Sequence, residues 1–481
     1  MAILKKGLCL EMSMENKEPN TRIKINDLHE KLVGTSVYVQ GWVDTVREHG
    51  KLIFFDVRDV SGILQCVVSA KNATLFEEAK KLTRESSIGL TGNISLRPKN
   101  TINDKISTGT IEMSVAHLEV YNLCPPLPFE LDSSDVSEDI RLKYRYLDLR
   151  RKSMRHNMIF RSRLMKSLRD YMYTQGFNEF ETPMLAKSTP EGSRDYVVPS
   201  RVHAGKFYAL PQSPQLFKQL FMVAGMEKYF QIARCMRDED LRSDRQPEFT
   251  QLDVEMSFIN KEDIISLIEG LIKKLWKELL NVDIPIPFRR MTYADSMKKY
   301  NSDKPDLRKE TKEKYSFLWV VDFPSFDYSE EDKRYVATHH PFTMPNMQDF
   351  AKDKFKARSE AYDIVLNGVE IGGGSIRIHD SKIQEKVFEV LALSKEEQRE
   401  KFGFLLDALS FGAPPHGGIA LGLDRILQLM LEVESIREVI AFPKNSDARD
   451  VMLDCPSDLT KKQLAEAHIS LDLPKKIIKK K

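Results

Sequence analysis

The chain has 481 residues, of which 41% are hydrophobic and 30% are charged, and its formal net charge at pH 7 is +2. This length predicts two or three domains, and the composition is typical of a folded globular protein, which excludes a disordered chain. No apolar run approaches the roughly 20 residues that a membrane-spanning helix needs. Because the net charge is small, a nucleic-acid partner has to be met by local basic patches.

The first 21 residues are expected to form a disordered leader. Glu11 interrupts their short apolar stretch, and they have neither a signal-peptide core nor the arginine-rich character of a transit peptide. The five cysteines are scattered without a CxxC pair, which indicates neither a zinc site nor a disulfide framework. These observations predict a cytoplasmic protein.

Residues 22–122 predict a small β-barrel. A helix is expected at 75–85 and a turn at 48–50. Alternating apolar and polar residues, rich in β-branched and aromatic side chains, predict five strands at 37–43, 52–59, 63–69, 87–96 and 110–120. Three strands, a helix and two more strands is the order of an OB-fold. The strand pattern alone equally allows a barrel that binds no ligand.

A hinge is predicted at residues 123–142, where prolines precede an acidic stretch. A long helix should follow, because apolar residues recur at i, i+4 spacing and Gly176 stands where a C-cap glycine belongs. Its apolar face contains Phe160, Leu164, Leu168 and Met172.

Residues 143–457 are expected to form a second domain. Strands alternate there with amphipathic helices such as 261–280, which indicates an α+β domain around a mainly antiparallel sheet flanked by helices. Residues 458–481 predict a basic C-terminal tail, whose lysines add non-specific attraction to RNA phosphates.

Three separated segments carry candidate chemistry. The first is the long helix with Gly176 and the following FNEFETP, which ends at Pro183. The second, residues 229–255, places the charged loop RDEDLRSDRQPE between two apolar strands. The third, GGIALGLDRILQLM at 417–430, puts glycines, which let a backbone approach a ligand, before an Asp-Arg pair whose arginine offers a fork for phosphate oxygens. Taken singly, each segment also fits an ordinary structural role.

Together and in this order, the segments resemble the three signature motifs of the class II aminoacyl-tRNA synthetases. Finer features are similar to the bacterial-type aspartyl-tRNA synthetases, namely YRYLDLRR, STPEGSRDY, QSPQLFKQ, HHPFT, NGVEIGGGSIRIH and FGAPPHGG. The resemblance covers about residues 22–456 and implies an OB-fold anticodon-binding barrel followed by a class II catalytic domain. One departure is a short link near 300–315, where these enzymes usually carry a large insertion domain.

The resemblance implies an aspartate–tRNA ligase, which activates L-aspartate with ATP and esterifies it to the 3′ end of tRNA(Asp). Cations and Mg²⁺ should dominate this chemistry because charge builds at the α-phosphorus. By resemblance, Arg237 and Arg425 are the catalytic residues, and Asp363 and Glu370 bind Mg²⁺ through hard oxygen ligands. The ATP-binding residues so implied are Arg237, Asp238, Glu239, Gln246, Glu370, Gly422, Leu423, Asp424 and Arg425.

The pocket for the anionic substrate side chain should contain cations. Lys218 and Arg377 fill the matching positions, and Arg377 is expected to grip the β-carboxylate bidentately. Asp253 is expected to accept hydrogen bonds from the substrate ammonium. The resemblance adds Ser213, Gln215, Arg237, His339 and Glu191, the last on a loop expected to close over the pocket. A charged sensor and a neutral orienting residue are both compatible with His339.

On the barrel, the resemblance implies an anticodon site, because OB-folds bind single-stranded bases by stacking and polar contacts. Its candidate residues are Phe54, Gln65, Arg47 and His49. Phe54 has a core alternative, since either Phe54 or its neighbour Phe55 must face inward. His49 resembles slightly more the enzymes that also charge tRNA(Asn), and charging of tRNA(Asp) alone stays open. A homodimer is expected, with the long helix and FNEFETP as the subunit contact.

The same arrangement of a barrel and a class II domain allows other functions. Lysyl- and asparaginyl-tRNA ligases share it, but an asparagine pocket has no need of two cations and a lysine pocket requires carboxylates that QSPQLFKQ does not supply. A non-catalytic paralogue that only binds tRNA is the alternative of another class. The joint presence of Arg237, Glu370 and Arg425 argues against it.

Overall fold

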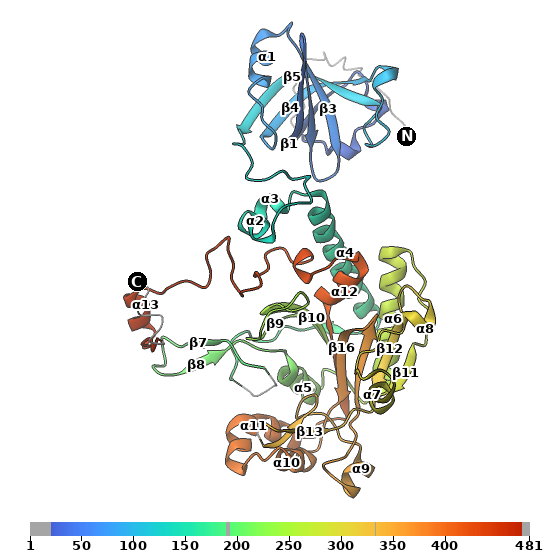
Figure 1. Cartoon of the computed structure of the whole chain (residues 1–481), viewed down its shortest axis with the longest axis vertical. Coiled ribbons are helices and arrows are strands. Elements are labelled where there is room, and N and C mark those ends of the chain that lie inside the picture. Colours follow the sequence, from blue (N-terminus) through green and yellow to red (C-terminus); the bar gives the residue numbers. More distant parts are fainter. Residues whose placement is uncertain (1–20, 189–192, 332, 474–481) are drawn as a thin grey trace, which may run out of the picture. The chain divides into compact units, whose positions relative to one another are not determined.

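The computed structural model describes residues 21–188, 193–331 and 333–473 (Figure 1). The chain forms two compact units, Met1–Glu130 and Leu131–Lys481. Apart from Thr21, the expected leader lies outside the described residues, as do residues 474–481 of the expected tail. Within the described ranges, no helix has the length and apolar character that crossing a membrane requires.

In its described part, the first unit is a closed barrel with strand order β1-β2-β3-β5-β4. Helix α1 (Ala73–Ala79) lies between β3 and β4 in the chain, which confirms the predicted OB-fold. The strands are β1 (Ser36–His49), β2 (Leu52–Arg58), β3 (Ile63–Ser69), β4 (Ser87–Leu96) and β5 (Ile111–Asn122).

Strand β1 is twice as long as the sequence predicted. A β-bulge between Val43 and Thr45 lets its first half pair with β4 and its second half with β2. The strand therefore runs through His49, and the hairpin turns at Gly50, whose φ is +59°. Helix α1 is shorter than predicted, because the chain turns after Ala79 and buries Leu82 in the barrel core.

An eight-stranded sheet organises the described part of the second unit, with the order β11-β12-β15-β16-β17-β10-β9-β6. The pairs β11–β12 and β6–β9 at the two edges are parallel and the other neighbours are antiparallel, as expected for this α+β domain. The strands are β6 (Asn178–Glu179), β9 (Lys228–Met236), β10 (Glu248–Ser257), β11 (Arg289–Thr292), β12 (Phe317–Val321), β15 (Ala361–Leu366), β16 (Val369–Ile376) and β17 (His416–Gly422).

The main core lies between one face of this sheet and three helices, α4 (Lys152–Thr174), α6 (Lys261–Leu280) and α12 (Leu423–Leu431). Gly176 has a φ of +77°, the left-handed conformation expected after the end of α4. The predicted apolar face of α4 is confirmed, since the buried residues include Phe160, Leu164, Leu168 and Met172.

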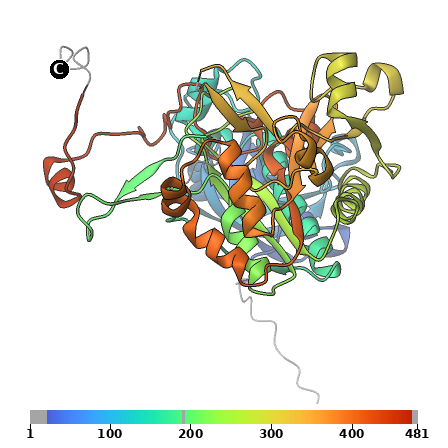
Figure 2. The same cartoon turned by 90° about the horizontal axis from the view of Figure 1, so that it is seen from below.

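A second apolar cluster joins α5 (Gln215–Val223), α10 (Ser381–Val390) and α11 (Lys395–Ser410) (Figure 2). Small helices complete the described part of this unit, namely α2 (Glu138–Lys143), α3 (Arg145–Asp148), α7 (Tyr293–Tyr300), α8 (Arg308–Thr311), α9 (Met347–Lys352), α13 (Lys461–Glu466) and the 3-10 turn η4 (Ile436–Glu438). Helix α2 begins inside the predicted hinge, and only residues 301–316 link α7 to β12.

Two short hairpins lie outside the main sheet. One is β13 (Phe326–Ser329) with β14 (Arg334–Ala337), and the other is β7 (Val197–Pro199) with β8 (Phe207–Ala209). Both Figures 1 and 2 show the β7–β8 hairpin projecting from its unit. Its apolar side chains are exposed, with Val202 at 73% and Phe207 at 52%.

Candidate active site

A cavity of about 360 Å³ in the second unit is lined by residues of β10, β15, β16 and β17 and of the loops beside them. Many predicted site residues, far apart in the chain, converge on it. They are Ser213, Gln215, Lys218, Arg237, Glu239, Gln246, Asp253, His339, Asp363, Glu370, Arg377, Gly422, Asp424 and Arg425. The structure thus brings the phosphate, metal and amino-acid candidates together, and their individual roles stay predictions.

Three predicted residues are not among those that line the cavity. Asp238 is exposed, and its backbone N–H donates to the carbonyl of Arg194 at 3.1 Å. Leu423 is fully buried in the core beneath α12, so its side chain is not available to ATP. The resemblance implies Leu423 as an ATP-binding residue only as part of the GLDR motif, and its apolar side chain belongs to the inner face of the helix. Glu191 lies outside the described residues.

At one end of the cavity, two arginines present cationic groups. Arg425 donates from Nη1 to the carbonyl of Glu370 at 2.9 Å and from Nη2 to Asp244 at 3.2 Å. The Arg237 guanidinium lies 5.1 Å from the ring centroid of Phe249, and its buried Nε has no hydrogen-bond partner among the described residues. An unpaired buried donor is costly, and a phosphate or carboxylate oxygen would satisfy it. Sequence reasoning missed Phe249, which offers an aromatic face to a purine ring.

The carboxylate of Asp424 connects the motifs through hydrogen bonds and is not available as a ligand-binding group. It accepts from the Thr250 backbone N–H at 2.9 Å and from Arg161. Arg161, on α4, also donates to the Thr250 hydroxyl and to the carbonyl of Val439, both at 3.0 Å. One side chain of the first motif therefore holds the second and third motifs together. Sequence reasoning missed this residue, because its partners are distant in the chain.

The two predicted metal ligands lie on the β15–β16 hairpin, as the expected strand–turn–strand. Asp363 is buried, and its Oδ1 has no hydrogen-bond partner in the described part of the chain. Burial, and next the nearby carboxylate of Glu370, raises the pKa of Asp363 well above its usual value. A Cβ at position 373 would stand 2.5 Å from that Oδ1, so Gly373 keeps the space before the carboxylate open.

This pair fits a divalent cation. A cation would compensate the like charges that raise the Asp363 pKa and would satisfy the orphaned oxygen. Among the described residues, no group of three His, Cys, Asp or Glu side chains is arranged to hold a metal. Mg²⁺ would therefore be held by Asp363 and Glu370 together with substrate oxygens, which is how this ion is commonly bound.

The predicted aspartate pocket is a buried charge network. Lys218 Nζ lies 2.8 Å from Asp253 Oδ1 and 3.4 Å from Glu255 Oε2. Arg377 donates to Glu255 from Nε at 2.9 Å and from Nη2 at 3.2 Å. All four side chains are at most 1% exposed, and two cations face two carboxylates. Asp253 Oδ2 is buried and has no partner among the described residues, so it can accept from a substrate ammonium.

Glu255 was missed although the sequence contained a signal for it. On β10, Leu252, Val254 and Met256 point into the apolar core, whereas Asp253 and Glu255 alternate with them. Two carboxylates at period two on an otherwise apolar strand must share the opposite face. Gly418 of β17 makes room for this face, since a Cβ there would meet Glu255 Oε2 at 2.1 Å.

The bidentate grip expected of Arg377 is not available in this arrangement. Besides its two bonds to Glu255, Arg377 donates from Nη1 to Ser375 Oγ at 2.7 Å and to His340 Nε2 at 2.6 Å. Of five guanidinium N–H groups, the contacts to described residues leave one, on Nη2. A β-carboxylate would meet this N–H together with the Lys218 ammonium. His340 was not foreseen from the sequence.

The titratable groups here are shifted by burial and by Arg377. Burial lowers the pKa of His339 to about 4, with Arg377 as the second cause, so this side chain is neutral near pH 7. This favours the neutral orienting role over the charged sensor. Burial also lowers the pKa of His340 well below its usual value. Burial opposes ionisation of Glu255, yet Arg377 and Lys218 prevail and hold its pKa below the usual range.

The barrel presents the predicted anticodon residues on its outer surface. Phe55 is fully buried, whereas Phe54 is partly exposed and lies edge-on to the His49 ring at 6.2 Å, so the core alternative for Phe54 is excluded. The strand register places Arg47 opposite Phe54. Gln65 donates to Glu112 at 2.8 Å.

A further candidate on the barrel is Arg97, which sequence reasoning missed. Its Nε donates to the carbonyl of Ile111 at 2.9 Å. Its buried Nη2 has no hydrogen-bond partner in the described residues. The carboxylates of Asp56 and Glu112 lie close enough to act on its pKa, which burial lowers. A base edge or phosphate oxygen would satisfy this donor.

Comparison with known families agrees with this geometry. A family model described as tRNA synthetases class II (D, K and N) matches residues 137–446, and one described as OB-fold nucleic acid binding domain matches residues 37–121. The chain belongs to the class II tRNA synthetases. Because the first match covers more than half of the chain, this assignment concerns the whole catalytic unit and not an isolated motif.

Relatives place the chain more finely. It is 43% identical to the aspartate--tRNA(Asp/Asn) ligase of Caldanaerobacter subterraneus subsp. tengcongensis, over 93% of this chain and 98% of the relative. It is 42% identical to the ligase of the same name from Thermoanaerobacter pseudethanolicus, over 92% and 96%. This synthetase therefore belongs to the bacterial aspartate–tRNA ligase family. The first match runs over 578 positions, more than the 481 residues present here, so that relative carries segments that this chain lacks.

Solved structures confirm the fold. The asparaginyl-tRNA synthetase of Pyrococcus horikoshii with asparaginyl-adenylate has a TM-score of 0.73 and 24% identity, covering 88% of this chain and 98% of that one. A putative aspartyl-tRNA synthetase from Leishmania major Friedlin has a TM-score of 0.75 and 19% identity, covering 90% and 96%. At such identities, the likeness concerns the fold alone.

Proposed function

We propose that this synthetase is an aspartate–tRNA ligase that activates L-aspartate with ATP and Mg²⁺ and transfers it to tRNA. The observation that carries the proposal is a single cavity that brings three kinds of group together. They are an arginine whose buried Nε has no partner among the described residues, a pair of neighbouring carboxylates, and a buried pocket in which two cations face two carboxylates. Arg237 supplies the first, Asp363 with Glu370 the second, and Lys218 with Arg377 the third. Each group is proposed to bind one part of ATP or of aspartate.

In the first step, the substrate α-carboxylate attacks the α-phosphorus of ATP, and pyrophosphate leaves. Arg237 is the residue proposed to bridge the α-carboxylate and the α-phosphate, which would neutralise the charge that develops there. Arg425, held by Asp244 and the carbonyl of Glu370, is proposed to bind the outer phosphates. Bound Mg²⁺ would supply further charge neutralisation at the phosphates, held by Asp363 and Glu370. In the second step, the 3′-terminal hydroxyl of tRNA attacks the activated carbonyl, and AMP leaves.

The pocket selects aspartate by charge. The aspartate side-chain carboxylate would meet both the Lys218 ammonium and one Arg377 N–H, whereas an asparagine amide offers one oxygen and would turn its NH2 group toward the second donor. Leaving that buried donor without an acceptor costs about 1–3 kcal/mol. A pyrophosphate-exchange assay with each of the twenty amino acids tests the proposal. Exchange with aspartate alone is the expected result, and exchange with none would leave only the tRNA-binding alternative.

The tRNA range belongs to the proposal as well. We infer that the enzyme charges both tRNA(Asp) and tRNA(Asn). Two observations support this, namely that its relatives are aspartate--tRNA(Asp/Asn) ligases and that His49 lies beside Phe54 on the barrel. The alternative is charging of tRNA(Asp) only. Charging of the two purified tRNAs at equal concentration decides between them.

A homodimer in the cytoplasm completes the proposal. Apolar side chains that a second copy would cover are exposed on α4 and just after Pro183, including Tyr173 at 54% and Leu185 at 51%. A two-fold contact of this kind is the commonest oligomer geometry. Light scattering should give twice the chain mass at micromolar concentration. Leu185→Glu should lower that mass, whereas Phe411→Glu, at another exposed apolar residue, should not.

A further inference from the structure

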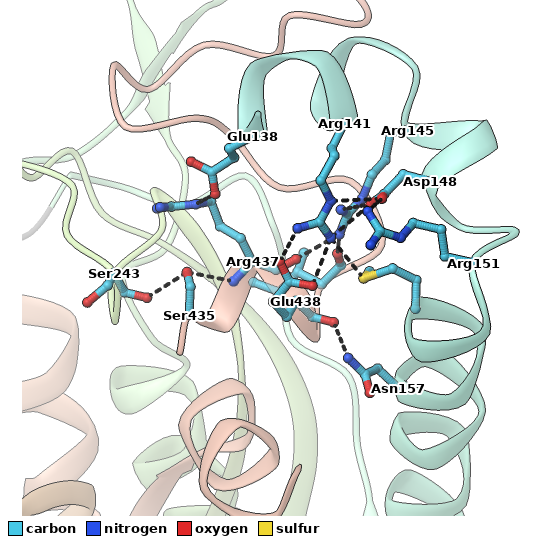
Figure 3. A network of polar contacts seen from close by, with 12 residues as sticks. Glu138, Arg141, Arg145, Asp148, Arg151, Asn157, Ser243, Ser435, Arg437 and Glu438 are labelled. Atoms are coloured by element: carbon cyan, nitrogen blue, oxygen red, sulfur yellow. Dashed lines mark hydrogen bonds and ion pairs between the residues drawn. The ribbon is translucent and has the colours of Figure 1, made fainter. Parts of the chain in front are cut away.

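A polar network joins the first helices of the catalytic unit to a turn beyond the third motif (Figure 3). At its centre, the fully buried carboxylate of Asp148 accepts from Arg141 Nε at 2.8 Å and from Arg145 Nη1 at 2.5 Å. Arg141 extends its two terminal nitrogens to Glu438, at 2.8 and 2.9 Å. The turn η4, which contains Glu438, is therefore clamped by helices α2 and α3.

The chain that follows η4 is held by the same helices. We call residues 435–444 the strap. Arg145 donates to three strap carbonyls, those of Arg437 at 2.7 Å, Ile440 at 2.9 Å and Ala441 at 2.8 Å. The strap thus receives charge-assisted hydrogen bonds along its length, which are stronger than neutral ones.

The other side of the strap contacts the charged loop 237–247, which we call the motif-two loop. The Ile436 N–H and the Ser435 hydroxyl both donate to the carbonyl of Ser243 at 3.1 Å (Figure 3). Gln246 exchanges two hydrogen bonds with the backbone of Lys444, at 3.0 and 2.8 Å. Between these two attachment points lies Asp244, the partner of Arg425.

The motif-two loop depends on these polar contacts. Among the described residues, none of positions 237–247 belongs to a hydrophobic cluster, so apolar packing does not fix the loop. The same loop carries Arg237, Glu239 and Gln246 into the cavity. A displacement of the strap would therefore move the groups proposed to hold ATP.

We propose that Glu438 is a positioning residue for ATP binding, acting through the strap on the motif-two loop. This inference rests on the proposed function, because it takes the loop to be part of the ATP site. Glu438 itself is not among the residues that line the cavity. Loss of its carboxylate removes the ion pair between η4 and Arg141, while Arg145 still holds the carbonyl of Arg437. The weaker attachment of η4 should loosen the two hydrogen bonds to Ser243 and so weaken the placement of Asp244 and Arg425.

The test is Glu438→Gln, which keeps the size of the side chain and removes its charge. In ATP–pyrophosphate exchange, the KM for ATP should rise about five- to ten-fold, the scale of one weakened charge-assisted hydrogen bond. The KM for aspartate should rise less than the KM for ATP, because the strap contacts no side chain of the buried charge pocket in the described structure and acts on aspartate only through Arg237 of the motif-two loop. Equal increases in both constants would overturn the proposal.

Glu313→Gln is the matched control. Glu313, which follows α8, accepts from Arg289 of β11 at 2.8 and 2.9 Å, the same two-bond arrangement as the Glu438–Arg141 pair but away from the strap. Both constants should stay at the wild-type values in this variant. Thermal melts of both variants are recorded beside the kinetics. A lowered melting temperature of Glu438→Gln with an unchanged KM for ATP reduces Glu438 to a structural role and sinks the idea.

Ser435→Ala decides the matter if Glu438→Gln fails to fold. It removes the hydrogen bond to Ser243 and the N-cap contact with the Arg437 N–H, and it leaves the ion pair in place. It should raise the KM for ATP more than the KM for aspartate. Where Glu438→Gln does fold, the effects of the two changes should not add in the double variant, because both act through one turn. An unchanged KM for ATP in Ser435→Ala rejects the proposal. Absence of aspartate-dependent exchange by the wild-type protein would instead reject the proposed function.

Discussion

Lys218 and Arg377 are buried beside carboxylates of a single strand, so each proposed substrate contact would be made by a group that already has a partner. Such a pocket is preorganised, since its cations are held in place before the substrate arrives. The cost of that arrangement is that no member can be changed alone without leaving a buried charge uncompensated.

A first prediction concerns Lys218→Met, which keeps the length of the side chain and removes its charge. The catalytic efficiency kcat/KM for aspartate should fall at least about a hundred-fold, because a buried charge contact of this kind is worth several kcal/mol. Pyrophosphate exchange at varied aspartate measures this. Wild-type efficiency in a variant that remains folded would remove Lys218 from the pocket.

The buried histidines lead to a pH prediction. Burial lowers the folded-state pKa of His340 below the unfolded value of 6.5, so the unfolded chain binds the proton first as the pH falls. The stabilisation is complete above pH 6.5 and is lost as the pH falls through the folded value. The melting temperature should therefore decline below pH 6.5. In His340→Gln, which still accepts from Arg377 but does not titrate, the decline should be shallower.

His203→Gln is the control for that experiment. His203 is exposed on the β7–β8 hairpin, so its removal should leave the slope of melting temperature against pH unchanged. An identical slope in His340→Gln and in the wild type would show that His340 does not contribute.

At the scale of elements, α4 does more than pack against the sheet, because Arg161 joins it to both other motifs. Arg161→Met should leave Asp424 with only the Thr250 N–H as partner and lower the free energy of unfolding by ~1–3 kcal/mol. Urea unfolding measures the loss. Arg163→Met, two residues along on the exposed face of the same helix, should change it little.

The elements also show how far sequence reasoning reaches. Helix α6 has the bounds that its periodicity predicted, and its ends carry local signals, a capping box at Asn260 and a left-handed Asn281. The length of β1 was not predictable in this way, because the bulge at Val43 matters only through pairing with two different strands. Local sequence patterns therefore predict features that neighbouring residues determine, such as the ends of α6. Features that depend on strand pairing, such as the length of β1, are not predicted by them.

The same division applies to the site. Residues within recognisable motifs, such as Arg237 and Arg425, were predicted through the family resemblance, and both line the cavity. Arg161 and His340 were not found, since the contacts that give them meaning join distant segments. Glu255 lies between these cases, because the alternation on β10 pointed to it and only the charge count of the pocket shows its role.

For the whole molecule, the proposed anticodon site and the proposed ATP site belong to different compact units. Phe54→Ala should therefore weaken tRNA charging by ~1–3 kcal/mol of binding, the usual contribution of one stacked base. Exchange without tRNA and the melting temperature should be nearly unchanged.

Phe55→Ala is the matched comparison for Phe54, since it changes the neighbouring ring that the barrel core buries completely. It should lower barrel stability by ~3–5 kcal/mol. Phe54→Ala should therefore weaken RNA binding, whereas Phe55→Ala should lower the stability of the folded barrel. Normal charging by Phe54→Ala, with an unchanged melt, would contradict the stacking role.

The shared carboxylates of the amino-acid pocket also constrain how this enzyme can evolve. Lys218, Asp253, Glu255 and Arg377 form one electrostatic unit, so a mutation toward another substrate passes first through a state with an unpaired buried charge. Because of this epistasis, the barrier between aspartate specificity and the specificities of related enzymes is the low stability of the singly substituted intermediates, and not the number of substitutions. Laboratory evolution of new specificity should therefore yield paired substitutions at a cation and its carboxylate far more often than single ones.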